Sequence, residues 1–203
     1  MKIICVGKNY ISHIKEFDGV MPEKMVLFMK PDTAIHNLEI PYYLPDFTQN
    51  LHYEVEIVLK INQNGKCISE KFAHKYYDEL SVGIDFTARD LQAELSQKGL
   101  SWEKAKAFDG SAIIGKFFHK NTLGDISSLS FRLEKNGTVV QQGITNDMLW
   151  HFDAIIAETS RYFTLRKGDL IFTGTPKGVG KVSQGDILEG FLANEKGFSL
   201  KVK

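Results

Sequence analysis

Strict alternation of apolar and polar positions runs through residues 51–61, LHYEVEIVLKI. Side chains two positions apart on a strand point the same way, so this pattern predicts a β-strand. One face is apolar and carries Tyr53, Val55, Ile57, Leu59 and Ile61. The other face carries His52, Glu54, Glu56, Val58 and Lys60. Glu54 and Glu56 are therefore neighbours, either in water on a half-buried strand or aimed together at a divalent cation, which makes two like charges tolerable.

Similar patterns predict many other short elements. Apolar runs predict strands over 3–6, 80–84, 169–173, 187–192 and 198–202. Helices are expected over 11–17, 72–80, 88–98 and 149–163. Asn64-Gly65 and Asn136-Gly137 predict hairpin turns, and Thr87 with Asp90 forms a variant capping box before the third helix. Many short strands with few helices predict a β-rich α+β fold with helices at its edges.

The composition is typical of a globular domain, and we expect a single domain over residues 1–203. Acidic and basic residues balance at 25 each, without a basic block, so nucleic acid is not an expected partner. The N-terminal apolar run has four residues and no run approaches about 18, so we expect neither a signal peptide nor a membrane span. Cys5 and Cys67 lack metal-binding spacing and give no support for a disulfide, which favours a reducing cytoplasm.

His13 and Glu16 form the first pair of residues with candidate chemistry. They are three positions apart in a predicted helix and therefore share one face. On the surface such a pair is an ordinary ion pair. In a cavity the carboxylate orients the imidazole and raises its basicity, which is how a general base is built.

A second group of candidates follows the strand predicted over 80–84. Asp85 lies at the end of that strand, where it serves either turn chemistry or a metal. Arg89 and Gln92 share one face of the next helix and are expected to point back over Asp85. Lys106 lies among small and apolar neighbours, which favours partial desolvation of its amine.

The glycine-rich segment GTPKGVGK, residues 174–181, resembles a P-loop but does not match it. Five residues separate Gly174 from Gly180 where the motif has four, and Val182 replaces the magnesium-binding Ser or Thr. The segment is either a tight turn between strands or a loop whose backbone N–H groups hold a carboxylate with help from the Thr175 hydroxyl.

Six motifs in chain order resemble those of the fumarylacetoacetate hydrolase family: GKNYISHIKE, LFMKP, HYEVEIVL, GIDFTARDLQ, SWEKAKAFDGS and GDLIFTGTPKGVG. The similarity spans residues 7–180 and is strongest to the short members of the acylpyruvase and oxaloacetate-decarboxylase type. It implies a mixed β-sandwich roll with a few peripheral helices, a homodimer, and a bound Mg²⁺ or Mn²⁺, which Ca²⁺ can replace in crystals. Residues 110–114, GSAII, depart from a proline-containing segment found in many members.

The resemblance also implies roles for individual residues. Three carboxylates would bind the metal: Glu54, Glu56 and Asp85. The catalytic residues would be the pair His13 and Glu16, on a segment that orders as a lid, and the lysine Lys106. Four further side chains would line the substrate pocket: Lys30, Arg89, Gln92 and Thr175.

The activity that we expect is metal-dependent hydrolysis of the carbon–carbon bond of acylpyruvate-like β-diketo acids. His13, oriented by Glu16, would activate water, and the metal would stabilise pyruvate enolate. Oxaloacetate decarboxylase or tautomerase, and hydratase or isomerase of 2-hydroxy-dienoate catabolites, need the same enolate and stay open. Two non-enzymes also stay open, a metal-containing binding protein and a β-sandwich module without metal. The expected partners are a small 2-oxo acid and a second copy of the chain.

Overall fold

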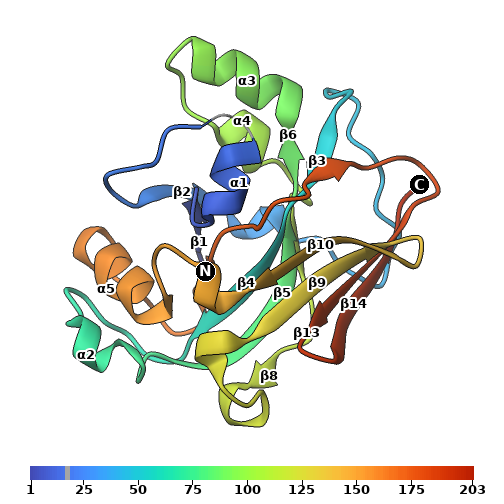
Figure 1. Ribbon diagram of the computed structural model, residues 1–203. Coiled ribbons are helices and arrows are strands. Elements are labelled where there is room, and N and C mark those ends of the chain that lie inside the picture. The colour runs from blue at the N-terminus through green and yellow to red at the C-terminus, as the bar shows by residue number, and fades with distance from the viewer. Residues whose placement is uncertain (17–18) are drawn as a thin grey trace.

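The computed structural model describes residues 1–16 and 19–203, and within these ranges three β-sheets make up most of the regular structure (Figure 1). The largest sheet has the strand order β2-β1-β11-β4-β5-β7, with β8 also paired to β5. Its strands are β1 (Ile3–Gly7), β2 (Val26–Lys30), β4 (Val55–Ile61), β5 (Tyr77–Asp85), β7 (Ala112–Ile114), β8 (Phe118–His119) and β11 (Leu170–Phe172). Within this sheet β1 and β11 are parallel and the other pairs are antiparallel.

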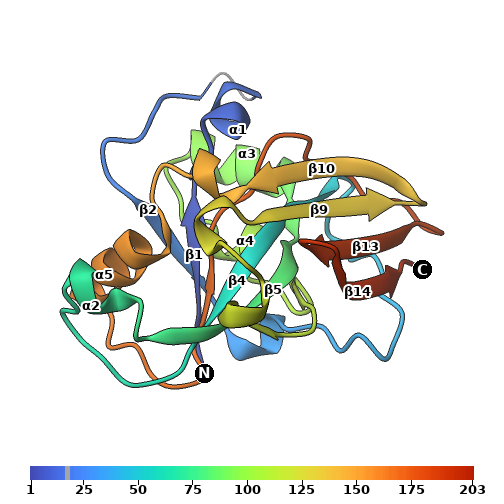
Figure 2. The ribbon, with the colours of Figure 1, turned by 60° about the horizontal axis from the view of Figure 1, so that its bottom comes forward.

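A four-stranded antiparallel sheet packs against β4 and β5 of the large sheet (Figure 2). It has the order β10-β9-β13-β14, with strands β9 (Ser130–Lys135), β10 (Thr138–Ile144), β13 (Ile187–Leu192) and β14 (Glu195–Lys201). The sheets meet closely, since a Cβ added to Gly197 would lie 2.5 Å from Val82 Cγ1. Side chains of both sheets, among them Ile84 and Leu133, share one hydrophobic core. The result is the β-rich fold that the many short strands predict, arranged as the sandwich that the family resemblance implies.

A small three-stranded sheet and short helices complete the described structure. The small sheet contains β12 (Gly180–Lys181), β3 (Leu51–Tyr53) and β6 (Thr87–Ala88). The α-helices are α1 (Ile11–Glu16), α2 (Glu70–Ala73), α3 (Arg89–Gln97), α4 (Glu103–Lys106) and α5 (Phe152–Tyr162). Short 3₁₀ helices occur at Asp32–Ala34, Lys120–Thr122, Ile126–Ser128 and Thr145–Asp147. Helices α1, α3 and α4 lie at the same end of the molecule, near β3 and β6 (Figure 1).

Several local expectations are confirmed. Asn136 and Gly137 have φ angles of 54° and 78°, as a type I′ hairpin turn requires. Helix α5 buries Phe152, Ile155 and Ile156, which are three and four positions apart as helical spacing requires. Helix α3 ends just before Gly99, whose φ of 64° is the left-handed conformation that suits glycine. The helix expected over 11–17 is present as α1, and Phe17 lies outside the described residues.

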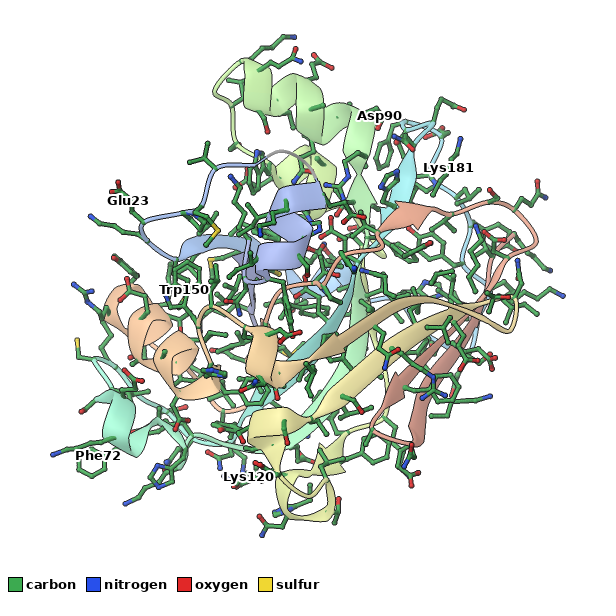
Figure 3. All side chains as sticks on the ribbon, in the orientation of Figure 1. Glu23, Phe72, Asp90, Lys120, Trp150 and Lys181 are labelled. Carbon is green, nitrogen blue, oxygen red and sulfur yellow. The ribbon has the colours of Figure 1, made fainter. Side chains whose placement is uncertain are left out.

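Three other expectations are wrong, each because long-range pairing overrides local preference. The chain forms α2 and then enters β5 at Tyr77, where a helix over 72–80 was expected, because this stretch pairs with β4. Asn64-Gly65 is not a hairpin turn, since the Gly65 N–H donates to the carbonyl of Leu165 at 2.9 Å. The capping box does not form. The side chain of Asp90, labelled in Figure 3 at the start of α3, instead accepts hydrogen bonds from Thr48 Oγ1 at 2.5 Å and Gln49 N at 2.9 Å.

The predicted strand over 51–61 is divided at Glu54, with β3 joining the small sheet and β4 the large one. Both faces of β4 are buried apart from the partly exposed Lys60, so the acidic face does not meet bulk water. Cys5 is buried, Cys67 is exposed, and both are free thiols. Among the described residues, no helix has the length and apolar character needed to cross a membrane.

Candidate active site

Three carboxylates converge where β4 begins and β5 ends. In the antiparallel pairing Val55 lies opposite Ile84, and the Asp85 N–H donates to the Glu54 carbonyl at 2.8 Å. Glu54, Glu56 and Asp85 each offer an oxygen, and these oxygens all lie within 4.8 Å of one another. The residues are only 4%, 2% and 1% exposed, so the half-buried, water-facing alternative for the acidic pair is excluded.

Three cationic side chains surround these carboxylates. Lys106 Nζ, from α4, lies 2.7 Å from Glu54 Oε2 and 2.7 Å from Asp85 Oδ2. Arg89, at the start of α3, forms an ion pair with the second oxygen of Glu54. Lys30 Nζ lies 2.8 Å from Asp85 Oδ1. The cluster therefore balances three acids with three bases in a buried volume, where each charge depends on its partners.

The charges act unequally on the pKa values of the cluster. Burial alone would raise the pKa of Glu54, but Lys106 and Arg89 outweigh burial and hold it well below its ordinary value. Burial raises the pKa of Glu56 well above its ordinary value, and the negative charges of Asp85 and Glu54 add to this rise. Burial favours the neutral amine of Lys106, but Asp85 and Glu54 outweigh it and raise that pKa, so Lys106 stays cationic.

The donor set suits a hard divalent cation. All three clustered groups are carboxylates, which are typical ligands of Mg²⁺ and Mn²⁺, whereas structural zinc prefers sulfur and nitrogen. Glu56 receives a hydrogen bond from the Gly174 N–H at 2.7 Å, and burial, with the negative charges of Asp85 and Glu54, raises its pKa, so that a cation beside it would be favourable. The residues present therefore fit a magnesium or manganese ion.

The cluster lies in the wall of a cavity of about 500 Å³. Of the residues predicted from the sequence, those lining this cavity are His13, Glu54, Glu56, Asp85, Arg89, Gln92, Lys106 and Thr175. Lys30 does not line it. The Lys30 side chain lies behind Asp85, where Nζ also donates to Ser111 Oγ at 2.9 Å. Residues distant in sequence are thus brought together, but Lys30 is a partner of the carboxylates and does not face the cavity.

His13 and Glu16 form the expected pair on α1. His13 Nδ1 lies 3.2 Å from Glu16 Oε2, and the other oxygen of Glu16 accepts the Gly178 N–H at 3.0 Å. An ionised carboxylate only accepts hydrogen bonds, so the proton of a neutral His13 is on Nδ1 and Nε2 is the basic nitrogen.

The glycine-rich loop holds carboxylates, as predicted, but they belong to the protein itself. Gly174 donates to Glu56 and Gly178 donates to Glu16. Gly174 has a φ of 100°, and a Cβ there would lie 2.6 Å from Asn9 Cβ, so only glycine fits this position. The loop thereby links the acidic cluster to the His13–Glu16 pair.

Sequence reasoning missed several residues that line the cavity. Lys8 does so from a backbone with a φ of 57°. Phe28 and Trp102 form an apolar wall, with ring centroids 6.1 Å apart and edge-to-face, and Trp102 Nε1 donates to Ser96 Oγ at 3.0 Å. Their places inside three of the ordered motifs, GKNYISHIKE, LFMKP and SWEKAKAFDGS, are the signal that could have found them.

The chain belongs to the fumarylacetoacetate hydrolase family, a family of enzymes, since the family's sequence model, described as "Fumarylacetoacetate (FAA) hydrolase C-terminal", matches residues 2–196. Oxaloacetate tautomerase FAHD1, mitochondrial, of Bos taurus is 37% identical over 201 residues, which are 99% of this chain and 91% of the relative. Oxaloacetate tautomerase YcgM of Escherichia coli (strain K12) is 40% identical over 188 residues, 92% of this chain and 86% of the relative.

Solved structures show the same fold. Fumarylpyruvate hydrolase from Pseudomonas aeruginosa, in complex with Mn²⁺ and pyruvate, has a TM-score of 0.93 and 33% identity, covering 100% of this chain and 89% of that chain. A 5-carboxymethyl-2-hydroxymuconate delta-isomerase from Mycobacterium smegmatis has a TM-score of 0.86 and 33% identity, and the match covers 99% of this chain and 78% of that chain. The α+β, sheet-rich fold class is confirmed.

Proposed function

We propose that this protein is a divalent-metal-dependent enzyme that interconverts the keto and enol forms of oxaloacetate. The observation that carries the proposal is the buried acidic cluster, three carboxylates within 4.8 Å, in the wall of a cavity that Lys106 and His13 also line. Two relatives named oxaloacetate tautomerase, matched over more than nine-tenths of the chain, support this choice among the activities that need an enolate.

The reaction moves one proton between carbon 3 and the oxygen on carbon 2. A magnesium or manganese ion held by Glu54, Glu56 and Asp85 supplies Lewis acidity, typically worth several kcal/mol, for the charge that develops on that oxygen. Nε2 of His13 is the base that takes the proton from carbon 3. Lys106, cationic because its pKa is raised, is the group that stabilises the oxygen and delivers a proton to it.

The remaining cavity residues bind and orient the dicarboxylate. Arg89 and Gln92 present one polar wall, in which Arg89 Nη1 donates to Gln92 Oε1 at 2.6 Å. Thr175 lies at the opposite end of the glycine-rich loop from Gly180 and offers its hydroxyl to a carboxylate. The positive charge of Arg89, whose guanidinium is held by Gln92 and Glu54, and the Thr175 hydroxyl together orient the carbon skeleton, so that one C–H bond faces the base.

Acylpyruvate hydrolysis is the second candidate, and the His13–Glu16 pair favours it. With the proton on Nδ1, Nε2 can accept a proton from water while the water oxygen bonds to the distal carbonyl carbon. The carbon–carbon bond then breaks, its electrons pass to pyruvate enolate, and that enolate takes a proton on carbon 3. The fumarylpyruvate hydrolase relative supports this alternative.

The experiment that separates the candidates follows two reactions on one preparation. The ultraviolet absorbance of enol-oxaloacetate reports tautomerisation, and coupled pyruvate detection reports hydrolysis of acetylpyruvate and decarboxylation of oxaloacetate. We expect tautomerisation with Mg²⁺ or Mn²⁺ that EDTA abolishes and that His13→Ala reduces. Pyruvate release from acetylpyruvate alone would move the assignment to the hydrolase. Turnover that ignores EDTA would contradict the proposal, and no turnover at all would favour a binding protein.

The proposal includes a homodimer. Sedimentation equilibrium is expected to give twice the chain mass of 23.0 kDa. A mass of one chain would contradict this part of the proposal without affecting the chemistry.

A further inference from the structure

Gln141 is a buried polar residue from the four-stranded sheet. It lies on β10, where the register with β9 shifts between Val139 and Gln141. The extra residue at this bulge changes which side chains face inward. Val139 is 49% exposed, whereas Gln141 is 1% exposed and pairs with the core residue Leu133. The bulge therefore turns an amide into the space between the sheets, toward the candidate active site.

All polar atoms of the Gln141 side chain are used. Oε1 accepts the Val55 N–H at 2.8 Å, and Nε2 donates to Pro176 O at 2.9 Å and to Thr175 Oγ1 at 2.9 Å. The orientation of the amide is unambiguous, because a backbone N–H can only donate and a backbone carbonyl can only accept. Nε2 must therefore be the atom that faces Thr175, and the Thr175 oxygen must be the acceptor.

This assignment determines what the Thr175 hydroxyl can do. A hydroxyl has one proton and two lone pairs, and Gln141 occupies one lone pair. The proton must point away from Nε2, and among the described residues no acceptor for it is found. Thr175 is 4% exposed and lines the cavity, so an acceptor bound in the cavity is the natural partner of this proton.

Gln141 also holds the backbone between two carboxylates of the acidic cluster. Val55, whose N–H it receives, lies between Glu54 and Glu56 where β3 gives way to β4. One amide thus connects the metal-binding strand to the loop that carries Thr175.

We propose that Gln141 is a positioning residue that directs the Thr175 hydroxyl proton at the carboxylate of a bound 2-oxo acid. The inference rests on the proposed function in one respect, the binding of a 2-oxo acid in this cavity. A hydroxyl proton that is directed into the cavity forms a charge-assisted hydrogen bond with a carboxylate oxygen.

Two substitutions of nearly equal size separate this role from a structural one. Gln141→Glu still accepts the Val55 N–H, but its other oxygen accepts the Thr175 proton and so reverses that hydrogen bond. Gln141→Met removes all three hydrogen bonds and leaves the Thr175 hydroxyl to rotate toward the ligand. A purely structural role makes Met the more damaging change, whereas a directing role makes Glu the more damaging change for ligand binding.

The measurement is the dissociation constant of pyruvate, by calorimetry on the intact protein with saturating Mn²⁺. We expect Gln141→Glu to weaken pyruvate binding about tenfold or more, as loss of a hydrogen bond to a charged group does, and Gln141→Met to weaken it less. Mn²⁺ affinity without pyruvate, read by electron paramagnetic resonance, should fall more in Gln141→Met, because only that variant loses the Val55 contact. The opposite order in pyruvate binding would overturn the inference.

A double mutant excludes simple charge repulsion. In a Thr175→Val background the hydroxyl is absent, so Gln141→Glu should weaken pyruvate binding no further than about twofold. An undiminished loss in that background would overturn the directing role even where Gln141→Met fails to fold. Wild-type protein that does not bind pyruvate would also overturn it. Pyruvate binding with the expected pattern but no turnover of oxaloacetate would overturn only the proposed function.

Discussion

Buried carboxylates occur in two different settings in this protein, and the contrast separates structural acids from acids available for chemistry. Asp169 and Asp186 each follow a glycine with a left-handed φ, of 89° and 91°, just before a strand. Each accepts a backbone N–H from three residues earlier in the chain, from Arg166 and Ser183, both at 2.7 Å. These carboxylates are satisfied mainly by their own turn.

One cation completes each of these turn sites. Lys2 pairs with Asp169, and Lys135 Nζ lies 2.9 Å from Asp186. Burial raises the pKa of Asp186, but hydrogen bonds from Lys135, Ser183 and Asn136 outweigh burial and lower it. At each turn, a single carboxylate charge is therefore balanced by one lysine and by hydrogen-bond donors of the surrounding chain.

The acidic cluster of the cavity is arranged differently. Glu54, Glu56 and Asp85 come from two strands and lie against one another, and their cationic partners are long side chains from other elements. The pKa of Glu56 is raised, where that of Asp186 is lowered. Carboxylates satisfied by their own turn stabilise the fold, whereas a carboxylate such as Glu56, buried against two others, lowers stability unless a cation joins it.

Removing Lys106 is the strongest way to test this contrast. Lys106→Met leaves Glu54 and Asp85 without the ammonium that lies 2.7 Å from both. We expect the metal-free protein to lose about 3–5 kcal/mol of unfolding free energy, the usual cost of breaking a buried ion pair. Chemical denaturation with EDTA measures this loss, and added Mn²⁺ should recover part of it. A variant as stable as wild type in EDTA would contradict the contrast.

Neutralising Glu56 should have opposite effects on activity and stability. Its raised pKa means that the folded state pays for keeping this carboxylate ionised at neutral pH, so Glu56→Gln should stabilise the metal-free protein by about 1 kcal/mol. Metal-dependent turnover should fall at least about 100-fold because a metal ligand is lost. Thermal unfolding in EDTA and enol-oxaloacetate assays with Mg²⁺ report the two effects. A loss of stability with turnover unchanged would place Glu56 with the turn carboxylates.

Neutralising Asp186 should have the opposite effects, a loss of stability and no change in turnover. Asp186→Asn should cost about 1 kcal/mol through the lost ion pair and hydrogen bonds, with turnover unchanged. The folded pKa of Asp186 is lowered below its ordinary 3.8, so its contribution is fully present above about pH 4 and disappears as pH falls through the folded pKa. Denaturation of wild type and variant between pH 7 and pH 2 should therefore show a stability difference that closes in acid. A difference that is constant over this range would refute the assignment.

The smallest effect is expected at an exposed pair. Lys98 Nζ lies 2.6 Å from Glu94 Oε1 on α3, and both side chains are more than half exposed. Solvent and salt screen such a pair, so Lys98→Ala should leave the melting temperature and turnover unchanged. A clear fall in melting temperature would show that exposed pairs on this protein act like the turn carboxylates.

Much of the fold follows from local patterns. The hairpin at Asn136-Gly137 and helices α3 and α5 were predicted because turn chemistry and apolar spacing act over a few residues. The stretch from Phe72 to Leu80 was predicted wrongly as a helix, since its strand character comes from pairing with β4. Alternation alone placed Glu54 beside Glu56, but bringing Asp85, His13 and Lys106 to the same place depended on the resemblance of ordered motifs.

The amino-acid sequence by itself determined which residue types were available and the local periods that arrange them, and it marked Glu54 and Glu56 as neighbours. Only the tertiary structure decided that both are buried, that Lys30 lies behind Asp85, and that Gln141 reaches Thr175 through a bulge in another sheet. The physical reason is the separation in sequence over which each interaction acts. Hydrogen-bond periods and turn preferences act between near neighbours in the chain, whereas burial, charge balance and hydroxyl orientation depend on groups that meet only after the sheets have packed.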